Sequence, residues 1–157
     1  MPTHAERRVL PYSSAQLYNL VADVARYPEF LPWCIAARIK QKRDSHIIAD
    51  LVIGFKMIRE RFTSHVYLNE QEMKIDVSYV DGPFKHLRNH WIFEPHPDGC
   101  EIDFYVDFEF RNRLLQKLME ALFHEAVRRM VAAFESRAND LYGQPADAPA
   151  ASSTPKV

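Results

Sequence analysis

The strongest constraint on the fold is a change of hydrophobic period along the chain. Between Cys34 and Phe110 apolar and polar residues alternate, as in the run from Ala49 to Phe55. Alternation with period two is typical of strands that have one buried and one solvated face, which favours an antiparallel sheet. From Asn112 to about Tyr142 the apolar residues recur every three or four positions, with no Pro or Gly between them. The sequence therefore predicts about six consecutive strands and then one helix roughly 45 Å long.

A short strand and a short helix are predicted before this sheet. Residues 4–10 form the strand, Pro11 ends it, and Ser13 or Ser14 caps the helix that follows. A sheet with one apolar face and a long helix with one apolar stripe bury each other most economically when the sheet curves around the helix. The expected fold class is therefore α+β, a curved antiparallel sheet wrapped around a long C-terminal helix, with room for a cavity between them.

The end of the chain has a different composition. Residues 144–157 read QPADAPAASSTPKV, which is rich in Pro, Ala and Ser and offers almost nothing to bury. Such a segment is expected to be a disordered tail. Residues 1–143 are expected to form one domain, since the 157 residues of the chain suit a single core.

Charge and cysteine content narrow the classes of function. The formal net charge is −1, which argues against a general nucleic-acid binder, so DNA is not an expected partner. Cys34 and Cys100 lie outside any CxxC pair and are expected to be free thiols in a reducing compartment. No apolar run approaches the ~20 residues of a membrane span, and no secretory signal is visible.

The common catalytic motifs are absent. The sequence has no GxGxxG, no GKS/T loop and no GxSxG elbow. His124-Glu125 begins like a zinc-protease helix, but Arg128 stands where the second histidine should be. His86 and His90 share a strand face, where a solvated or hydrogen-bonded pair is favoured over a metal site. We therefore expect no enzyme activity, no metal and no cofactor.

Two local features break the usual patterns. Glu60 occupies an apolar-face position between Ile58 and Phe62, where a carboxylate is costly unless it is paired. Either a neighbouring arginine or a bulge accommodates it, or it is a polar group inside a ligand cavity. Residues 27–34, YPEFLPWC, place three aromatic residues and two prolines in a loop. A rigid apolar loop must cover something: the core, a cavity mouth, or a membrane headgroup layer.

Three segments carry a resemblance to a known family. They are YPEFLPWC at 27–34, GFKMIRERFTSHV at 54–66 and DGPFKHLRNHWIF at 81–93. Together they resemble the coenzyme-Q-binding proteins of the START-like, polyketide-cyclase-related superfamily, over roughly residues 3–142. That group includes the mitochondrial coenzyme Q chaperone and a bacterial ribosome-association toxin of the toxin–antitoxin type.

The resemblance implies a helix-grip fold with a hydrophobic tunnel that holds ubiquinone without catalysis. The protein is then a carrier that supports respiration. In the family's motifs Pro32 and Trp33 match the loop over the tunnel, Leu51 and Glu60 match its lining, and Lys117 matches a basic residue of the long helix. The further expected ligand-binding residues are Phe30, Ile53, Phe62, Ile75, Tyr79, Trp91, Phe104, Leu118, Leu122, Ala126 and Met130.

The absence of a transit peptide favours a bacterial protein, located in the cytoplasm or peripheral to the cytoplasmic face of the inner membrane. Ubiquinone or a similar polyprenyl lipid is the expected ligand. Two other hypotheses stay open. One is a ribosome-binding inhibitor of subunit association, which would be supported if Lys117, Arg128 and Arg129 formed one uninterrupted patch. The other is an aromatase/cyclase-like enzyme that uses Glu60 or a cavity histidine as general base.

Overall fold

The computed structural model of the chain describes residues 3–55 and 58–143. In order, the elements are β1 (Thr3–Leu10), α1 (Ser14–Ala22), the 3₁₀ helix η1 (Val24–Glu29), β2 (Cys34–Lys42), β3 (His46–Phe55), β4 (Ile58–Asn69), β5 (Lys74–Asp81), β6 (Phe84–His96), β7 (Gly99–Phe110) and α2 (Arg113–Tyr142). This is the predicted order. The predicted tail, residues 144–157, lies outside the described residues.

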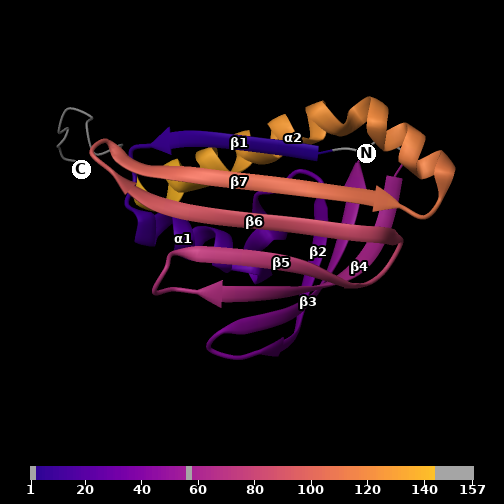
Figure 1. The fold of residues 1–157 in the computed structure, drawn as a ribbon, viewed down its shortest axis with the longest axis horizontal. Coiled ribbons are helices and arrows are strands. Elements are labelled where there is room, and N and C mark those ends of the chain that lie inside the picture. The colour runs from indigo at the N-terminus through magenta and orange to yellow at the C-terminus, as the bar shows by residue number, and fades with distance from the viewer. Residues whose placement is uncertain (1–2, 56–57, 144–157) are drawn as a thin grey trace.

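The strands form one antiparallel sheet in the order β1-β7-β6-β5-β4-β3-β2 (Figure 1). Each strand pairs with the one before it along the chain, except that β1 lies beside β7 at the other edge, with Thr3 opposite Asp107. Register shifts interrupt the ladders β2–β3, β4–β5 and β6–β7. Such bulges bend strands and increase their twist, which lets the sheet curve.

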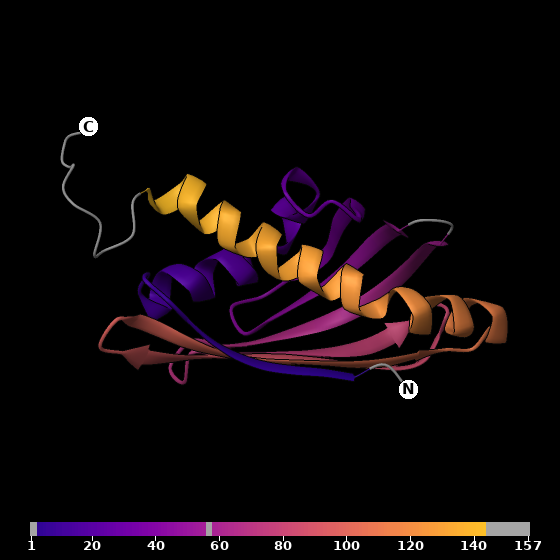
Figure 2. The same cartoon turned by 90° about the horizontal axis from the view of Figure 1, so that it is seen from above.

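Helix α2 crosses the concave side of this sheet, and α1 lies beside its C-terminal half (Figure 2). The side chains of α2 that are buried are Met119, Phe123, Val127, Phe134 and Ala138, which recur at helical spacing. They face buried residues of the sheet such as Trp91 and Phe104. The predicted α+β architecture, with the sheet gripping the helix, is confirmed.

Local sequence signals fix the ends of the helices. Ser13 caps α1 in a capping box with Gln16, as the sequence predicts for one of the two serines. Asn112 caps α2 by accepting hydrogen bonds from the backbone of Leu114 and Leu115. Within the described residues no helix is long and apolar enough to cross a bilayer.

Candidate ligand-binding cavity

An inner cavity of about 140 Å³ lies between the middle of α2 and the concave face of the sheet. Its walls come from α1, η1, five strands and α2, and include Leu51, Trp91 and Phe104. Most of the lining is apolar. The polar side chains are Ser64, Asn89 and the phenol of Tyr27, whose hydroxyl donates to the carbonyl of Val21.

An outer cavity, also of about 140 Å³, adjoins the inner one beneath the N-terminal half of α2. Its lining is entirely apolar: Trp33, Ile53, Phe62, Phe84, Leu87, Val106, Phe108, Phe110, Met119, Phe123, Ala126, Val127 and Met130. Of these, Trp33, Phe62, Leu87, Val106 and Met130 also line the inner cavity. The two spaces are therefore neighbouring compartments of one apolar hollow that runs along the helix.

The size of the hollow limits what it can hold. A cavity of about 150 Å³ lined by aliphatic and aromatic side chains accepts one benzene-sized molecule. The inner and outer cavities together therefore suit a substituted ring and one or two branched aliphatic units. A longer chain must leave the hollow. Trp33, Ile53, Ala126 and Met130 are each partly exposed, so this side of the outer cavity reaches the surface.

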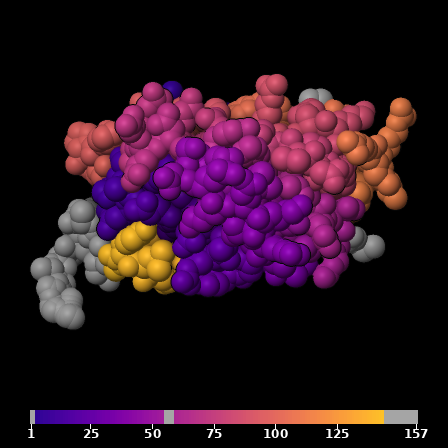
Figure 3. Space-filling model, turned by 90° about the horizontal axis from the view of Figure 1, so that it is seen from below, coloured from indigo at the N-terminus to yellow at the C-terminus, as the bar shows by residue number. Residues whose placement is uncertain are grey.

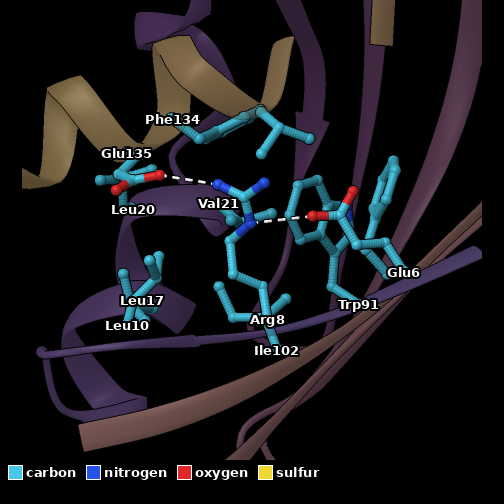
Figure 4. A pocket seen from close by; sticks show the side chains of 12 residues that line it. Glu6, Arg8, Leu10, Leu17, Leu20, Val21, Trp91, Ile102, Phe134 and Glu135 are labelled. Atoms are coloured by element: carbon cyan, nitrogen blue, oxygen red, sulfur yellow. Dashed lines mark hydrogen bonds and ion pairs between the residues drawn. The ribbon is translucent and has the colours of Figure 1, made fainter. Parts of the chain in front are cut away.

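A smaller side cavity of about 40 Å³ opens between β1 and α2 (Figure 4). It shares Val21, Trp91, Phe104 and Phe134 with the inner cavity. Arg8 spans its mouth. The guanidinium donates to Glu6 through Nε and to Glu135 of α2 through Nη1, both at 2.8 Å.

A second residue of β1, His4, also contacts Glu6, with 2.8 Å between His4 Nε2 and Glu6 Oε1. Burial alone would raise the pKa of Glu6, but hydrogen bonds from His4 and Arg8 and their positive charge lower it below its ordinary value. Glu6 is thus held as a carboxylate that orients Arg8. This edge of the hollow is closed by ions, whereas the Trp33 side has only apolar walls.

The polar groups of the inner cavity differ in how well they are satisfied. Asn89 donates to the carbonyl of Tyr105 at 2.8 Å and accepts from Nε1 of Trp91 at 3.0 Å. Nε1 of Trp33, in contrast, is buried and has no hydrogen-bond partner among the residues that the structure describes. A buried unpaired donor costs about 1–3 kcal/mol. Trp33 lines both cavities, so this unpaired donor belongs to a side chain of their shared wall.

The structure brings together many of the residues that the sequence predicted to bind ligand. Those that line the inner or outer cavity are Trp33, Leu51, Ile53, Phe62, Ile75, Trp91, Phe104, Ala126 and Met130. Both tryptophans of the chain are among them. Their direct contact with a ligand stays a prediction.

The other predicted residues lie outside the walls of both cavities. Phe30 packs against Phe134 with ring centroids 5.2 Å apart, and Pro32 is exposed. Tyr79 uses its hydroxyl to accept a hydrogen bond from the backbone of Phe84. In α2, Lys117 is exposed, and Leu118 and Leu122 are half-buried about two turns and one turn before Ala126, respectively. A role for these residues in ligand binding stays a prediction, and their places differ from the wall positions because helical and strand periodicity gives a face but not a depth.

Glu60 keeps the face that the sequence assigned to it. It pairs with Ile53 across the β3–β4 ladder, two residues before the cavity-lining Phe62. Its side chain is partly exposed and is not part of the cavity wall. Among the described residues no ion pair joins it to Arg59 or Arg61. Glu60 therefore lies toward the β3–β4 turn rather than inside the hollow.

The same pattern that drew attention to Glu60 could have revealed two missed residues. Ser64 follows Phe62 on the buried face of β4 and is 1% exposed, and Asn89 stands between Leu87 and Trp91 on the buried face of β6. A polar residue at an apolar-face position is the signal in each case. These two, together with the phenol of Tyr27 and without Glu60, are the polar groups of the inner cavity.

The remaining candidate reactive groups are engaged elsewhere. His86 contacts Asp107 at 3.2 Å and His90 contacts Asp103 at 3.8 Å on the outer side of the sheet. Cys34 and Cys100 are buried, and burial raises the pKa of the Cys34 thiol to about 11. In residues 3–55 and 58–143 no group of three or more His, Cys, Asp or Glu side chains is placed to hold a metal ion.

A curved antiparallel sheet that grips a long C-terminal helix over an apolar hollow defines a START-like, helix-grip protein. The model of the polyketide cyclase / dehydrase and lipid transport family matches residues 10–135, and the chain belongs to this family.

Named relatives carry two kinds of description. The ribosome association toxin RatA of Rickettsia prowazekii is 37% identical over 137 residues, which cover 85% of this chain and 94% of that protein. The mitochondrial coenzyme Q-binding protein COQ10 homolog B of Xenopus laevis is 35% identical over 145 residues, covering 90% of this chain and 59% of that protein. Among solved structures, the 18 kDa protein CC1736 of Caulobacter crescentus is 37% identical, with a TM-score of 0.77 over 92% of this chain and 100% of that one.

Proposed function

We propose that the protein is a non-enzymatic carrier that binds ubiquinone, or a similar prenylated quinone, in the apolar hollow beneath α2. The observation that carries the proposal is the hollow itself: two adjoining cavities, one with sparse polar groups and one with none. Ligand sites commonly combine apolar walls with a few polar groups of this kind. The coenzyme Q-binding relative from Xenopus laevis points to the same ligand class.

In this proposal the quinone ring occupies the inner cavity. A quinone carbonyl accepts hydrogen bonds but cannot donate them, and the buried indole N–H of Trp33 is a donor with no partner. A carbonyl placed beside Trp33 would satisfy that donor. The ring would also lie among flat aromatic walls that include Trp91 and Phe104.

The isoprenoid tail begins in the outer cavity. Each buried CH₂ contributes about 0.8 kcal/mol, so the first isoprene units alone supply useful affinity. The rest of a long tail exceeds the space beneath α2 and leaves on the Trp33 side. Quinones with one or two isoprene units should therefore bind nearly as tightly as long-tailed ones once differences in solubility are removed.

Binding can be tested through intrinsic fluorescence, because both tryptophans line the inner cavity. Quinones quench indole emission at contact, so titration with a short-tailed ubiquinone should give saturable quenching. Organic extraction of the purified protein and mass spectrometry then identify the native ligand. The proposal fails if the extract holds no quinone and added quinone produces only linear, collisional quenching.

Ribosome association is the second candidate, since several bacterial relatives bear the name of a ribosome association toxin. The basic residues that could contact RNA do not form one uninterrupted patch. Arg129 pairs with Glu125 at 2.9 Å, and Glu120 is exposed between Lys117 and Arg128. Co-sedimentation with the large ribosomal subunit, lost at raised salt, would support this candidate.

An aromatase/cyclase-like reaction has less support. Such chemistry needs a general base within hydrogen-bond reach of the substrate. The walls of the inner and outer cavities contain no His, Asp, Glu, Lys or Cys within the described part of the chain. Glu60, which that hypothesis offered as a base beside a cavity histidine, is not part of either wall.

A further inference from the structure

The first two turns of α2 have an unusual combination of side chains. Residues 111–118 read RNRLLQKL and contain three cations and no acid, the first acidic residue of the helix being Glu120. Leu114, in the middle of this segment, is 76% exposed. Figure 3 shows the start of α2 as a projection at one end of the molecule, and Figure 2 shows it extending past the sheet.

These side chains are not explained by the stability of the helix. Cations near a helix N-terminus oppose the helix dipole, and an exposed leucine gains nothing from burial. Arg111 donates to the carbonyl of Gly82 at 3.3 Å. The side chains of Arg113 and Lys117 make no ion pair or hydrogen bond with any other residue of the described ranges, and both are exposed. The composition of this segment is therefore better explained by a binding partner than by the folding of the helix.

An apolar row connects this segment with the hollow. Leu114, Leu118, Leu122, Ala126 and Met130 follow each other at intervals of four, so each lies beside the next in a row that winds around α2 by about 40° at every step. Leu114 is largely exposed to solvent, Leu118 and Leu122 are half-buried, and Ala126 and Met130 line the outer cavity. The distance along the helix from Leu114 to Ala126 is roughly 18 Å.

We infer that residues 111–118 are a docking tip for an anionic lipid bilayer, with Leu114 inserted and Arg113 and Lys117 at the headgroups, so that the apolar row leads a lipid from the bilayer into the outer cavity. The purpose of the docking tip, delivery of a lipid to the outer cavity, rests on the proposed function. The vesicle-binding test does not depend on that function. Both features that a bilayer surface requires are present, namely an apolar side chain and surrounding cations. RNA would satisfy the cations but would leave the exposed leucine without a partner.

The experiment is flotation of the full chain with vesicles of phosphatidylglycerol mixed with phosphatidylcholine, and with vesicles of phosphatidylcholine alone. Wild-type protein should float with the mixed vesicles and much less with the neutral ones, and raised salt should weaken the binding. Each cation near an anionic surface is worth about 1 kcal/mol, or roughly a fivefold change in affinity, so Arg113→Gln with Lys117→Gln should weaken binding roughly 25-fold. Leu114→Ser should weaken it roughly tenfold or more.

Matched controls come from the same helix and from the sheet. Leu141 is 50% exposed at the far end of α2, so Leu141→Ser should leave flotation unchanged. Lys40→Gln, on the exposed side of β2, removes a cation far from the tip with the same expected result. The inference is overturned if the tip variants float like wild type, if neutral vesicles bind equally well, or if the variants lose ribosome co-sedimentation and not flotation.

A second measurement does not depend on loss of binding. Cys34 and Cys100 are buried, so Leu114→Cys can be labelled selectively with an environment-sensitive dye. Its emission should shift to the blue with mixed vesicles, and an unchanged spectrum would count against insertion. Short-tailed quinone titration without vesicles separates the two proposals. If the protein binds quinone but not vesicles, only the docking-tip inference is refuted. If it binds vesicles but not quinone, only the carrier function is refuted.

Discussion

Filling the hollow is the most direct way to separate function from stability. Val106 of β7 lines both cavities, so Val106→Phe places a ring at their junction. An empty cavity costs about 24 cal/mol per Å³, so 140 Å³ left open costs about 3 kcal/mol. A ring that fills about half of one cavity should therefore stabilise the ligand-free protein by about 1.5 kcal/mol, or raise Tm by roughly 3–6 °C. Quinone binding should be lost.

The assay is thermal and urea unfolding of protein freed of bound lipid, alongside quenching of tryptophan emission by a short-tailed quinone. Ile47→Phe is the matched control, because Ile47 is 3% exposed and lines neither cavity. Overpacking there should destabilise the protein by about 1–3 kcal/mol. If Val106→Phe destabilises the protein as much as Ile47→Phe does, the space is not a true void. If it leaves quinone binding intact, the ligand lies elsewhere.

Three further predictions follow from single contacts. Trp33→Phe should weaken binding of a quinone roughly two- to tenfold, the value of one hydrogen bond, but should affect a prenyl hydrocarbon without oxygen less; an equal effect on both ligands would show that Trp33 acts only by packing. The His65 ring lies 2.8 Å from His46, and burial followed by the charge of His46 lowers the pKa of His65, so the folded state resists protonation. Stability should therefore fall as the pH drops below about 6.5, where the unfolded chain gains the proton, and His65→Gln should reduce that slope in Tm measurements between pH 7.5 and 5.5; an unaltered slope would contradict the assignment. Asn112→Ala removes the cap of α2 and should lower Tm by roughly 2–4 °C in calorimetry, whereas Asn112→Asp should preserve it.

The fold could be predicted because its signals are local and repeated. Alternation across five strands, the uninterrupted helical stripe and the caps at Ser13 and Asn112 each act over a few residues. The place of β1 beside β7 could not be predicted, since pairing between residues 3–10 and 100–107 leaves no local pattern. The wrapping of the sheet around the helix was predicted from their two apolar faces, and the resemblance to the family agreed with it.

The site was harder to predict because periodicity assigns a side chain to a face and says nothing about how deep it lies. Leu118 and Leu122 lie outside the wall, yet Met119 and Phe123, the next residue in each case, line the outer cavity. The difference is a turn of about 100° around the helix axis, and which part of a broad apolar stripe meets the cavity is a property of the tertiary arrangement. Ser64 and Asn89 were not predicted, because an uncharged polar residue at an apolar-face position is a weaker signal than a carboxylate such as Glu60.

Three features that reduce stability adjoin one another, from the start of α2 through the outer cavity to Trp33, which is part of its wall. Cations at the start of α2 oppose its dipole by about 0.3–1 kcal/mol each, the outer cavity is open, and the buried Trp33 donor is unpaired. Scattered through the fold they would be unrelated imperfections. In order from the surface inward they are a charged tip, an apolar passage and a hydrogen-bond donor, the features that a prenylated quinone would meet on the proposed route from a bilayer into the hollow. A chain that follows its local rules elsewhere departs from them where its function requires it, and here those departures trace a path from surface to interior.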